Sequence, residues 1–436
     1  MKVHVAIDTA EGVRQVGSLY HEARGAREFS VFEYLQEWRE SGGFALAPTM
    51  PPGDQVYTSK PAGTLHGSAL PGPIADAAPD AWGERLIRAQ WRALSRPVPN
   101  DLDFLLEVSD ECRWGALRFA DATGQSLAHL NSPIKLMELE QLVDDVARFE
   151  KTGNLPEGLA RNIAAASSPG GARPKVIVRD RDSLYIAKFT SVADENKAVE
   201  RAEVLALRLA QRAGIHVPSA RVVGAREAPI ALIERFDRTG AQRHHVISGQ
   251  SFLGVPTADG NDYADLIEQM RAHAAEFPRQ SRELYARVAF NVLIRSTDDH
   301  LKNVAFVHTE NGRWNLTSAF DLNPQPERHP QLKTAINGRF DATVDNLLSG
   351  STAFGIDFKE AKDIIHRVGR VVECHWRAEA AQAGMSKVEI DRYACAFVHE
   401  EVSKSLKLDV PQAQPSKSAP ARKRRQARQR DTGRAE

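Results

Sequence analysis

Three polar side chains in the C-terminal half constrain the fold of this chain most strongly: Asp298, Asn303 and Asp321. Asp298 and Asn303 stand five residues apart in the segment TDDHLKN at 297–303, and Asp321 follows in FDLNP at 320–324. The same Asp–Asn spacing occurs in the catalytic loop of protein kinases. Two carboxylates and an amide can hold Mg²⁺ against a nucleotide and leave one Asp to orient a hydroxyl. We therefore expect a fold that brings these three side chains together.

The residues between Asn303 and Asp321 predict a β-hairpin. Residues 304–307 and 313–316 have the composition of strands, and Asn311-Gly312 stands between them as a strong hairpin signal. Such a hairpin returns the chain toward Asp321. Two other interpretations of the acidic cluster stay open: a metallohydrolase site, disfavoured because no second His-rich motif stands nearby, and a purely structural Asp/Asn cluster.

Two segments nearer the N-terminus offer groups that bind phosphate. The segment SSPGGARPK at 167–175 contains paired glycines, whose backbone can approach phosphates and turn its N–H groups toward them. Lys188 lies in a predicted strand and shares one face with Ile186, so its ammonium can project into a cleft. The alternatives are an ordinary turn and an edge-strand lysine.

Residues 195–213 predict a helix that ends at Gly214. Glu203 falls near its apolar face, where a buried carboxylate needs a cation. We expect Lys188 to supply that cation, as in the Lys–Glu pair of kinases, with Glu200 as the second candidate. A solvent-exposed glutamate at the boundary of the face is the alternative.

The segment IERFDR at 233–238 ends the strand-rich region, where a hinge between two lobes is expected. Backbone groups of Glu234 and Phe236 are candidates for binding adenine, and the alternative is a charged strand end.

The side chains of the acidic segments receive chemical roles from their types. Asp298 accepts or orients the proton of a substrate hydroxyl, and Asn303 and Asp321 hold Mg²⁺ on the phosphates. His300 and Lys302 stabilise the loop or the transferring charge.

The order of predicted elements favours an α+β fold with two lobes and a β-rich subdomain before them. Residues 1–125 form that subdomain, with a strand through Val3, Val5 and Ile7 and a helix whose N-cap is Asp80. Residues 126–240 form a small sheet-rich lobe, with a hairpin formed by residues 176–178 and 184–189. Residues 241–408 form a larger helical lobe, with helices at about 262–275, 281–296, 341–348, 358–383 and 386–403. Residues 409–436 are a disordered basic tail.

Composition narrows the class of protein. No run of eighteen apolar residues is present, so no membrane span is expected, and the first residues read as a strand rather than a signal peptide. The three cysteines form no zinc motif and no disulfide framework, which favours a reducing cytoplasm. From Lys417 onward eight Lys and Arg residues face two carboxylates, and because the whole chain is neutral the rest is net acidic by about six.

Four motifs in this order resemble the HipA family: GGARPK at 170–175, IERFDR at 233–238, TDDHLKN at 297–303 and FDLNP at 320–324. The N-terminal region resembles that of the family through DAWG at 80–83 and WGAL at 114–117. The family consists of serine/threonine-protein kinase toxins of type II toxin–antitoxin systems. Membership implies an ATP- and Mg²⁺-dependent kinase with a fold distantly akin to lipid and protein kinases.

When the motifs are matched to those of the family position by position, the resemblance implies that Asp298 is the catalytic residue. It also implies that Ser168 is the site of a silencing autophosphorylation. It also implies that one set of residues contacts ATP or its metal: Gly170, Gly171, Ala172, Arg173, Pro174, Lys175, Lys188, Glu234, Arg235, Phe236, His300, Leu301, Lys302, Asn303, Phe320 and Asp321. Glu203 joins them as the partner of Lys188. The implied partners are a HipB-type antitoxin, DNA reached through that antitoxin or the basic tail, and a protein substrate such as a translation factor or an aminoacyl-tRNA synthetase.

The chain departs from the family at two places. Arg173-Pro174 stand where the best-known members have Gln-Glu, and residues 243–250 follow a different pattern. A second function stays open: a catalytically inactive nucleotide-binding corepressor that acts with a DNA-binding antitoxin. The basic tail is either a nonspecific contact for DNA phosphates or a solvated segment.

Overall fold

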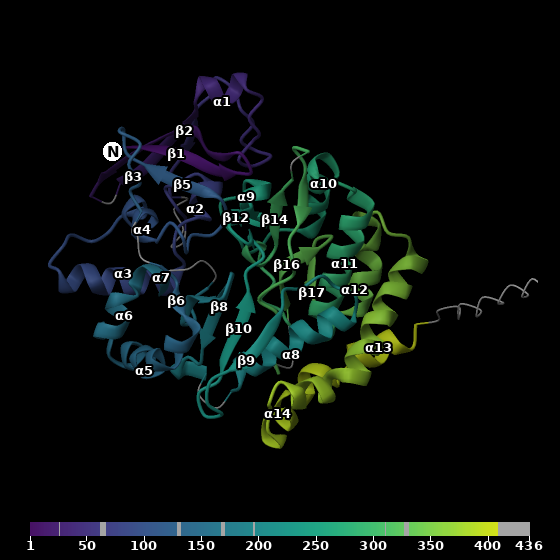
Figure 1. Cartoon of the computed structure of the whole chain (residues 1–436). Helices are drawn as coiled ribbons and strands as arrows, with labels where there is room; N and C mark the ends of the chain where they lie inside the picture. The colour runs from purple at the N-terminus through teal and green to yellow at the C-terminus, as the bar shows by residue number, and fades with distance from the viewer. Residues whose placement is uncertain are drawn as a thin grey trace, which may run out of the picture.

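The computed structural model describes residues 1–408 except 26, 62–66, 129–131, 167–170, 195–196, 310 and 327–330, and the side chains of Ala164 and Ala166 are also outside the description. The fold is α+β, with a β-rich N-terminal subdomain, a small sheet-based lobe and a larger, mainly helical lobe (Figure 1). The predicted basic tail lies outside the described residues. Among the residues described, no helix is long and apolar enough to cross a membrane.

The N-terminal subdomain is built on an antiparallel five-stranded sheet in the order β4-β3-β2-β1-β5. Its strands are β1 (Lys2–Thr9), β2 (Gly12–Arg24), β3 (Arg27–Tyr34), β4 (Tyr57–Ser59) and β5 (Leu117–Ala120). The predicted alternation in β1 is confirmed, because Val3, Val5 and Ile7 are all fully buried. In the motif WGAL at 114–117 the chain enters β5 only at Leu117, after Gly115 adopts a left-handed conformation with φ of 73°.

Four helices accompany this sheet: α1 (Gln36–Glu40), α2 (Gly72–Ala75), α3 (Ala81–Ala93) and α4 (Asp101–Glu107). The predicted cap of α3 is confirmed, since the Asp80 side chain accepts a hydrogen bond from the Gly83 amide at 2.9 Å. Trp82 of α3 is fully buried against the second lobe, in a cluster with Phe149 and Val176. The subdomain therefore packs directly on the sheet that follows it.

The small lobe has a second five-stranded sheet, in the order β6-β7-β8-β10-β9. Its strands are β6 (Ile134–Lys135), β7 (Lys175–Asp180), β8 (Ser183–Phe189), β9 (Ala220–Val223) and β10 (Ile230–Glu234). The helical segments of this lobe are η1 (Leu136–Leu142), α5 (Val143–Thr152), α6 (Glu157–Arg161), α7 (Ile163–Ala166), η2 (Val192–Asp194) and α8 (Val199–Arg212). The predicted hairpin is confirmed as β7 and β8, and the predicted helix as α8, which ends before a left-handed Gly214.

The large lobe is mainly helical. Its helical segments are α9 (Gly249–Leu253), α10 (Tyr263–His273), α11 (Phe277–Leu293), η3 (Leu301–Asn303), α12 (Val344–Gly350), η4 (Ser351–Phe354), α13 (Phe358–Gln382), α14 (Lys387–Phe397) and α15 (Glu400–Leu406). Its short strands are β11 (Arg238–Thr239), β12 (Gln242–Arg243), β13 (Val246–Ser248), β14 (Ala305–His308), β15 (Trp314–Leu316), β16 (Gln331–Ile336) and β17 (Arg339–Asp341). The predicted return from Asn303 toward Asp321 is confirmed as the antiparallel pair β14 and β15.

The prediction of one helix at 386–403 is wrong. The chain leaves the helical conformation at Val398 and His399 and starts α15 at Glu400. His399 Nε2 lies 3.1 Å from the carbonyl oxygen of Leu293, at the end of α11. A contact with a distant helix thus overrides a continuous local pattern.

Candidate active site

Lys188 and Glu203 form the centre of the candidate site, at the join between β8 and α8. The Lys188 ammonium donates hydrogen bonds to Glu203 Oε1 at 2.6 Å and to Asp321 Oδ1 at 2.7 Å. Lys188 comes from the small lobe and Asp321 from the large lobe, 133 residues later. The structure therefore places the predicted Lys–Glu pair and the predicted metal carboxylate in one cluster.

Burial and charge act against each other in this cluster. Burial alone lowers the pKa of Lys188, but Asp321 and Glu203 together raise it above its ordinary value. Burial alone raises the pKa of Asp321, yet Lys188 holds it well below the ordinary range. The pKa of Glu203 is raised, because the burial of its carboxylate outweighs the attraction of Lys188. One ammonium thus stands between two carboxylates.

The backbone of Asp321 has a positive φ of 56°, a conformation that residues other than glycine rarely adopt. Asn323 Nδ2 donates to Asp321 Oδ1 at 3.1 Å, and the backbone N–H of Asn323 donates to the Ser296 hydroxyl at 3.0 Å. These contacts stabilise the left-handed turn. Such strained residues cluster at functional sites, where the surrounding structure fixes a side chain in a required direction.

The loop after α11 carries the predicted catalytic residue. The apolar residues of α11, among them Leu284, Val288 and Val292, are buried in the core. The loop after the helix leaves Asp298 exposed, and Asn303 Nδ2 donates to the Asp298 carbonyl oxygen at 2.7 Å. One cavity brings the predicted acidic residues together, and its lining includes Ser296, Asp298, Asp299, Asn303, Phe320 and Asp321.

The residues between Asp298 and Asn303 differ in their surroundings. Leu301 is fully buried in the core, and its amide donates to the Ala258 carbonyl oxygen at 3.1 Å. Lys302 is exposed, and His300 is half-buried. Within the described part of the chain, His300 Nδ1 is a buried atom with no hydrogen-bond partner. Of these three predicted ATP contacts, Leu301 is the one whose side chain serves the core.

The glycine-rich segment is described from Gly171 onward, and the predicted residues Gly170 and Ser168 lie outside the described residues. Gly171 has a left-handed backbone with φ of 93°. Arg173 Nε donates to Asp194 Oδ2 at 2.8 Å. Lys175 opens β7 directly opposite Lys188 on β8, and its ammonium is bonded to Asp80 at 2.7 Å. Ala172 and Pro174 continue the segment between these contacts.

The predicted hinge is only partly directed at the cleft. The amides of Glu234 and Arg235 donate to the carbonyl oxygens of Ser219 and Leu184, both at 2.9 Å, so neither N–H is free for adenine. The Arg235 guanidinium points to the N-terminal subdomain, where it bonds the Cys112 and Arg113 carbonyl oxygens.

Phe236 takes the opposite direction from Arg235. Its ring lies 5.3 Å from that of Phe320, a residue of the cavity lining. Of the hinge side chains, Phe236 is therefore the one that the structure places at the site.

Comparison with known proteins identifies the relatives of this arrangement. A family model described as the HipA-like C-terminal domain matches residues 167–376, and one described as the HipA N-terminal domain matches residues 9–120. This chain belongs to the HipA family. The recognition made from the four motifs is confirmed. No curated protein sequence matches the chain significantly.

Solved structures agree with the family at the level of fold. A chain from the Shewanella oneidensis MR-1 complex of HipA, HipB and operator DNA matches with a TM-score of 0.64 and 18% identity, over 93% of this chain and 96% of that one. The Helicobacter pylori proinflammatory kinase CtkA matches at 0.36 and 12%, over 54% and 94%. The Streptococcus pneumoniae choline kinase LicA matches at 0.21 and 14%, over 55% and 91%. The last two scores are too low to support a conclusion.

The donor atoms of this HipA-family site suit Mg²⁺. Asp321 offers carboxylate oxygens, and Asn303 donates through Nδ2, which leaves its amide oxygen for a cation. Among the described residues Asn323 Oδ1 is buried without a hydrogen-bond partner, beside Asp321. Mg²⁺ prefers oxygen ligands and is held by one or two carboxylates together with substrate phosphates. Asp321 and Asn303 are therefore the residues that would hold it.

Asp299 is a residue that the sequence did not assign a role. It is buried and accepts hydrogen bonds from the Tyr263 hydroxyl at 2.9 Å and from the Lys333 amide at 2.6 Å. Thr334 Oγ1 donates to the Asp299 carbonyl oxygen at 2.7 Å. These bonds tie the loop of Asp298 to α10 and β16. The only sequence signal was a second carboxylate next to the first.

Replacing Asp299 with asparagine is expected to flatten the dependence of stability on pH. Burial raises the pKa of Asp299 to about 7, whereas an unfolded aspartate titrates near ~3.9. Between these values the folded state binds the extra proton, so the free energy of unfolding falls as pH rises, by at most about 1.4 kcal/mol per pH unit. Urea unfolding of wild type and variant across this range measures the difference. Parallel pH profiles of unfolding free energy in wild type and variant would contradict the raised pKa of Asp299. Asp259→Asn is the control, because Asp259 is an exposed carboxylate.

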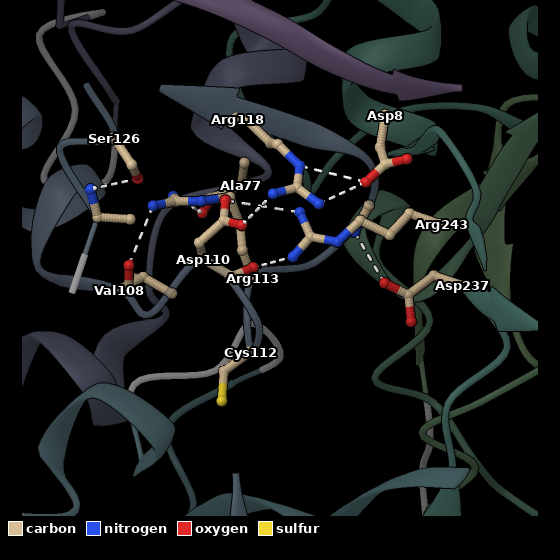
Figure 2. A network of polar contacts seen from close by, with 12 residues as sticks. Asp8, Ala77, Val108, Asp110, Cys112, Arg113, Arg118, Ser126, Asp237 and Arg243 are labelled. Carbon is tan, nitrogen blue, oxygen red and sulfur yellow. Dashed lines mark hydrogen bonds and ion pairs between the residues drawn. The ribbon is translucent and has the colours of Figure 1, made fainter. Parts of the chain in front are cut away.

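A buried arginine network joins the hinge to the N-terminal subdomain, and sequence analysis missed it. Asp237 is 1% exposed and accepts hydrogen bonds from Arg235, Arg238 and the Gly115 amide. Figure 2 shows the neighbouring part of the network, in which Arg118 bonds Asp8 and Asp110. The hinge of this HipA-family chain is therefore fixed from the side opposite the cleft.

Proposed function

We propose that this HipA-family chain is an ATP- and Mg²⁺-dependent protein serine/threonine kinase that acts as the toxin of a toxin–antitoxin system. One observation carries the proposal: Lys188 donates hydrogen bonds to both Glu203 and Asp321, and Asp321 lines a cavity together with Asp298 and Asn303. This is the set of groups that phosphoryl transfer needs, since catalysis in kinases rests mainly on positioning and electrostatic stabilisation.

Each residue receives a role from its contacts. Lys188 is held by Glu203 and directed at the phosphates, and Asp321 and Asn303 hold the metal. Mg²⁺, when bound, neutralises the negative charge of the phosphates. Asp298 is exposed in the cavity, where it orients the substrate hydroxyl and accepts its proton. Because the loop is tied back through Asp299, the position of Asp298 is fixed before substrate binds.

The remaining predicted contacts complete the nucleotide site. Phe236 and Phe320 supply an aromatic wall for adenine. We assign phosphate binding to Gly170 to Lys175, of which Gly171 has a left-handed backbone. We assign to His300 and Lys302 the stabilisation of the loop or of the transferring charge, and to Ser168 a silencing autophosphorylation. We assign residues 126–240 to nucleotide binding and residues 241–408 to catalysis.

The partners follow from the family. The Shewanella oneidensis protein of the same fold was solved with HipB and operator DNA. We infer a HipB-type antitoxin for this chain, and contact with DNA through that antitoxin or through the basic tail. The substrate is a protein with an accessible serine or threonine, an aminoacyl-tRNA synthetase being the family expectation. The cytoplasm is the proposed location.

Incubation of the purified chain with labelled ATP, Mg²⁺ and a cell lysate tests the proposal. We expect label on the chain itself and on at least one lysate protein, at serine or threonine, and its loss when Mg²⁺ is chelated. Mass spectrometry identifies the labelled residues. Tight ATP binding with no transfer to any protein would refute the kinase and support the corepressor function instead.

A further inference from the structure

The N-terminal end of α3, in the N-terminal subdomain, forms hydrogen bonds with the glycine-rich segment of the small lobe. Asp80 Oδ2 accepts a hydrogen bond from the Lys175 ammonium at 2.7 Å. Trp82 Nε1 donates to the Lys175 carbonyl oxygen at 3.0 Å, and Arg85 donates to the Ala172 carbonyl oxygen at 3.2 Å. Three contacts from the N-terminal end of α3 thus hold both ends of residues 172–175.

The central contact between α3 and this segment is a buried ion pair. The side chains of Lys175 and Asp80 are 2% and 8% exposed. The same ammonium donates to the Gly171 carbonyl oxygen at 2.9 Å, so the ion pair also fixes the backbone of the glycine-rich segment. Breaking such a pair leaves a buried ammonium without its counter-charge, which favours its movement toward solvent.

The position of Lys175 explains why it needs a carboxylate of its own. Lys175 and Lys188 are cross-strand partners in the β7–β8 pair, and like charges directly opposite each other repel. Lys188 is neutralised by Glu203 and Asp321, and Lys175 by Asp80. The two ammonium groups are therefore held by different carboxylates.

We propose that Asp80 is a positioning residue for the nucleotide site: by fixing Lys175 it holds the glycine-rich segment in the conformation that receives the phosphates. This inference rests on the proposed kinase function. It assigns a role in nucleotide binding to the N-terminal subdomain, which supplies Asp80 from a point 95 residues before Lys175.

The two oxygens of Asp80 separate this role from helix capping. Oδ1 accepts from the Gly83 amide and caps α3, whereas Oδ2 accepts from Lys175. Asparagine caps a helix as well as aspartate does but carries no charge. Asp80→Asn therefore keeps the cap and removes the ion pair. Glu84→Gln is the matched control, because Glu84 lies one turn further along α3 and pairs with Arg88.

Calorimetric titration with Mg–ATP is the first measurement. We expect Asp80→Asn to raise the Kd on the order of tenfold, the size of a lost charge-assisted hydrogen bond, with a much smaller change in kcat at saturating ATP. The Kd of Glu84→Gln for Mg–ATP should stay within about twofold of the wild-type value. When Lys175 is already replaced by glutamine, adding Asp80→Asn should raise the Kd further by less than about twofold, because Asp80 acts through Lys175. An unchanged Kd in Asp80→Asn, or the full effect in the Lys175→Gln background, would overturn the proposal.

Hydrogen exchange without nucleotide separates this proposal from the kinase function. Peptides covering 171–180 should exchange faster in Asp80→Asn than in wild type or Glu84→Gln, and equal exchange would overturn the inference. A wild type that shows this protection but binds no Mg–ATP would refute the kinase function and the positioning role that rests on it, while leaving the ion pair established. Should Asp80→Asn not fold, Arg85→Gln leaves the Asp80–Lys175 pair intact and removes the hydrogen bond to Ala172, together with the contacts of Arg85 with Trp82 and Glu150. Unchanged exchange over the same peptides in this variant would count against the proposed contact of α3 with the segment.

Discussion

Replacing Asp298 with asparagine is expected to slow phosphoryl transfer by about 100- to 10,000-fold, the range that positioned acid–base groups contribute. The carboxylate is exposed in the cavity, and the contact that fixes its backbone is the bond from Asn303 to its carbonyl oxygen. Asparagine retains this bond and the shape of the side chain but cannot accept a proton. The nucleotide affinity should therefore change little, since Lys188 and Asp321 are untouched.

Single-turnover assays with labelled ATP and calorimetric binding of Mg–ATP check the two halves of this expectation. Asp259→Asn is the matched control, since Asp259 is an exposed carboxylate that pairs with Lys333 and does not line the cavity. Transfer by Asp298→Asn at the wild-type rate would show that the catalytic assignment is wrong. A rate lost together with nucleotide binding would instead make Asp298 part of the binding site.

Replacing Asp237 with asparagine is expected to lower the free energy of unfolding by about 3–5 kcal/mol, as breaking a buried ion pair does. Asp237 is the carboxylate between Arg235 and Arg238, and all three side chains are at most 7% exposed. Both arginines also hold carbonyl oxygens of the N-terminal subdomain, so the loss should weaken the join between subdomain and hinge.

The pH dependence of this effect has a definite sign. Burial alone raises the pKa of Asp237, but Arg235 and Arg238 hold it well below the ordinary range. A carboxylate with a depressed folded pKa stabilises the fold above its unfolded pKa of ~3.9 and loses that contribution as pH falls toward the folded value. The difference between wild type and Asp237→Asn should therefore be full at neutral pH and shrink in acid.

Arg339 and Asp341 offer a control with the same sequence spacing and opposite burial. Their ion pair joins residues two apart, as that of Arg235 and Asp237 does, but both side chains are at least half exposed. Asp341→Asn should change stability by less than about 1 kcal/mol, because exposed ion pairs contribute little. Urea unfolding of the three proteins measures both values. Equal losses in Asp237→Asn and Asp341→Asn would contradict the role of burial.

Several parts of the site follow from local patterns alone. Helical periodicity placed Glu203 on the apolar face of α8, and strand alternation put Lys188 on the face away from Ala187 and Phe189. The Asn-Gly turn brought the chain back as β14 and β15. Each of these inferences uses contacts between residues close in sequence, whose geometry a helix or a hairpin fixes.

Other parts depended on surroundings that no local pattern encodes. The segment IERFDR gave no sign that Arg235 points away from the cleft, because its partners are carbonyl oxygens more than 120 residues earlier. Similarly, the break between α14 and α15 follows a contact with the end of α11, although the local pattern is continuous.

The sequence by itself determined which chemical groups this HipA-family chain has, their order, and the helices and strands that carry them, because spacing and periodicity act over a few residues. Only the tertiary structure decided that Asp80 meets Lys175 and that Asp321 joins Glu203 at Lys188. Asp80 pairs with Lys175 and Asp321 with Lys188 because the packing of separate sheets and helices brings each of these buried ammonium groups to a carboxylate that can neutralise it. That choice depends on the low polarity of the interior, which exists only once the chain has folded.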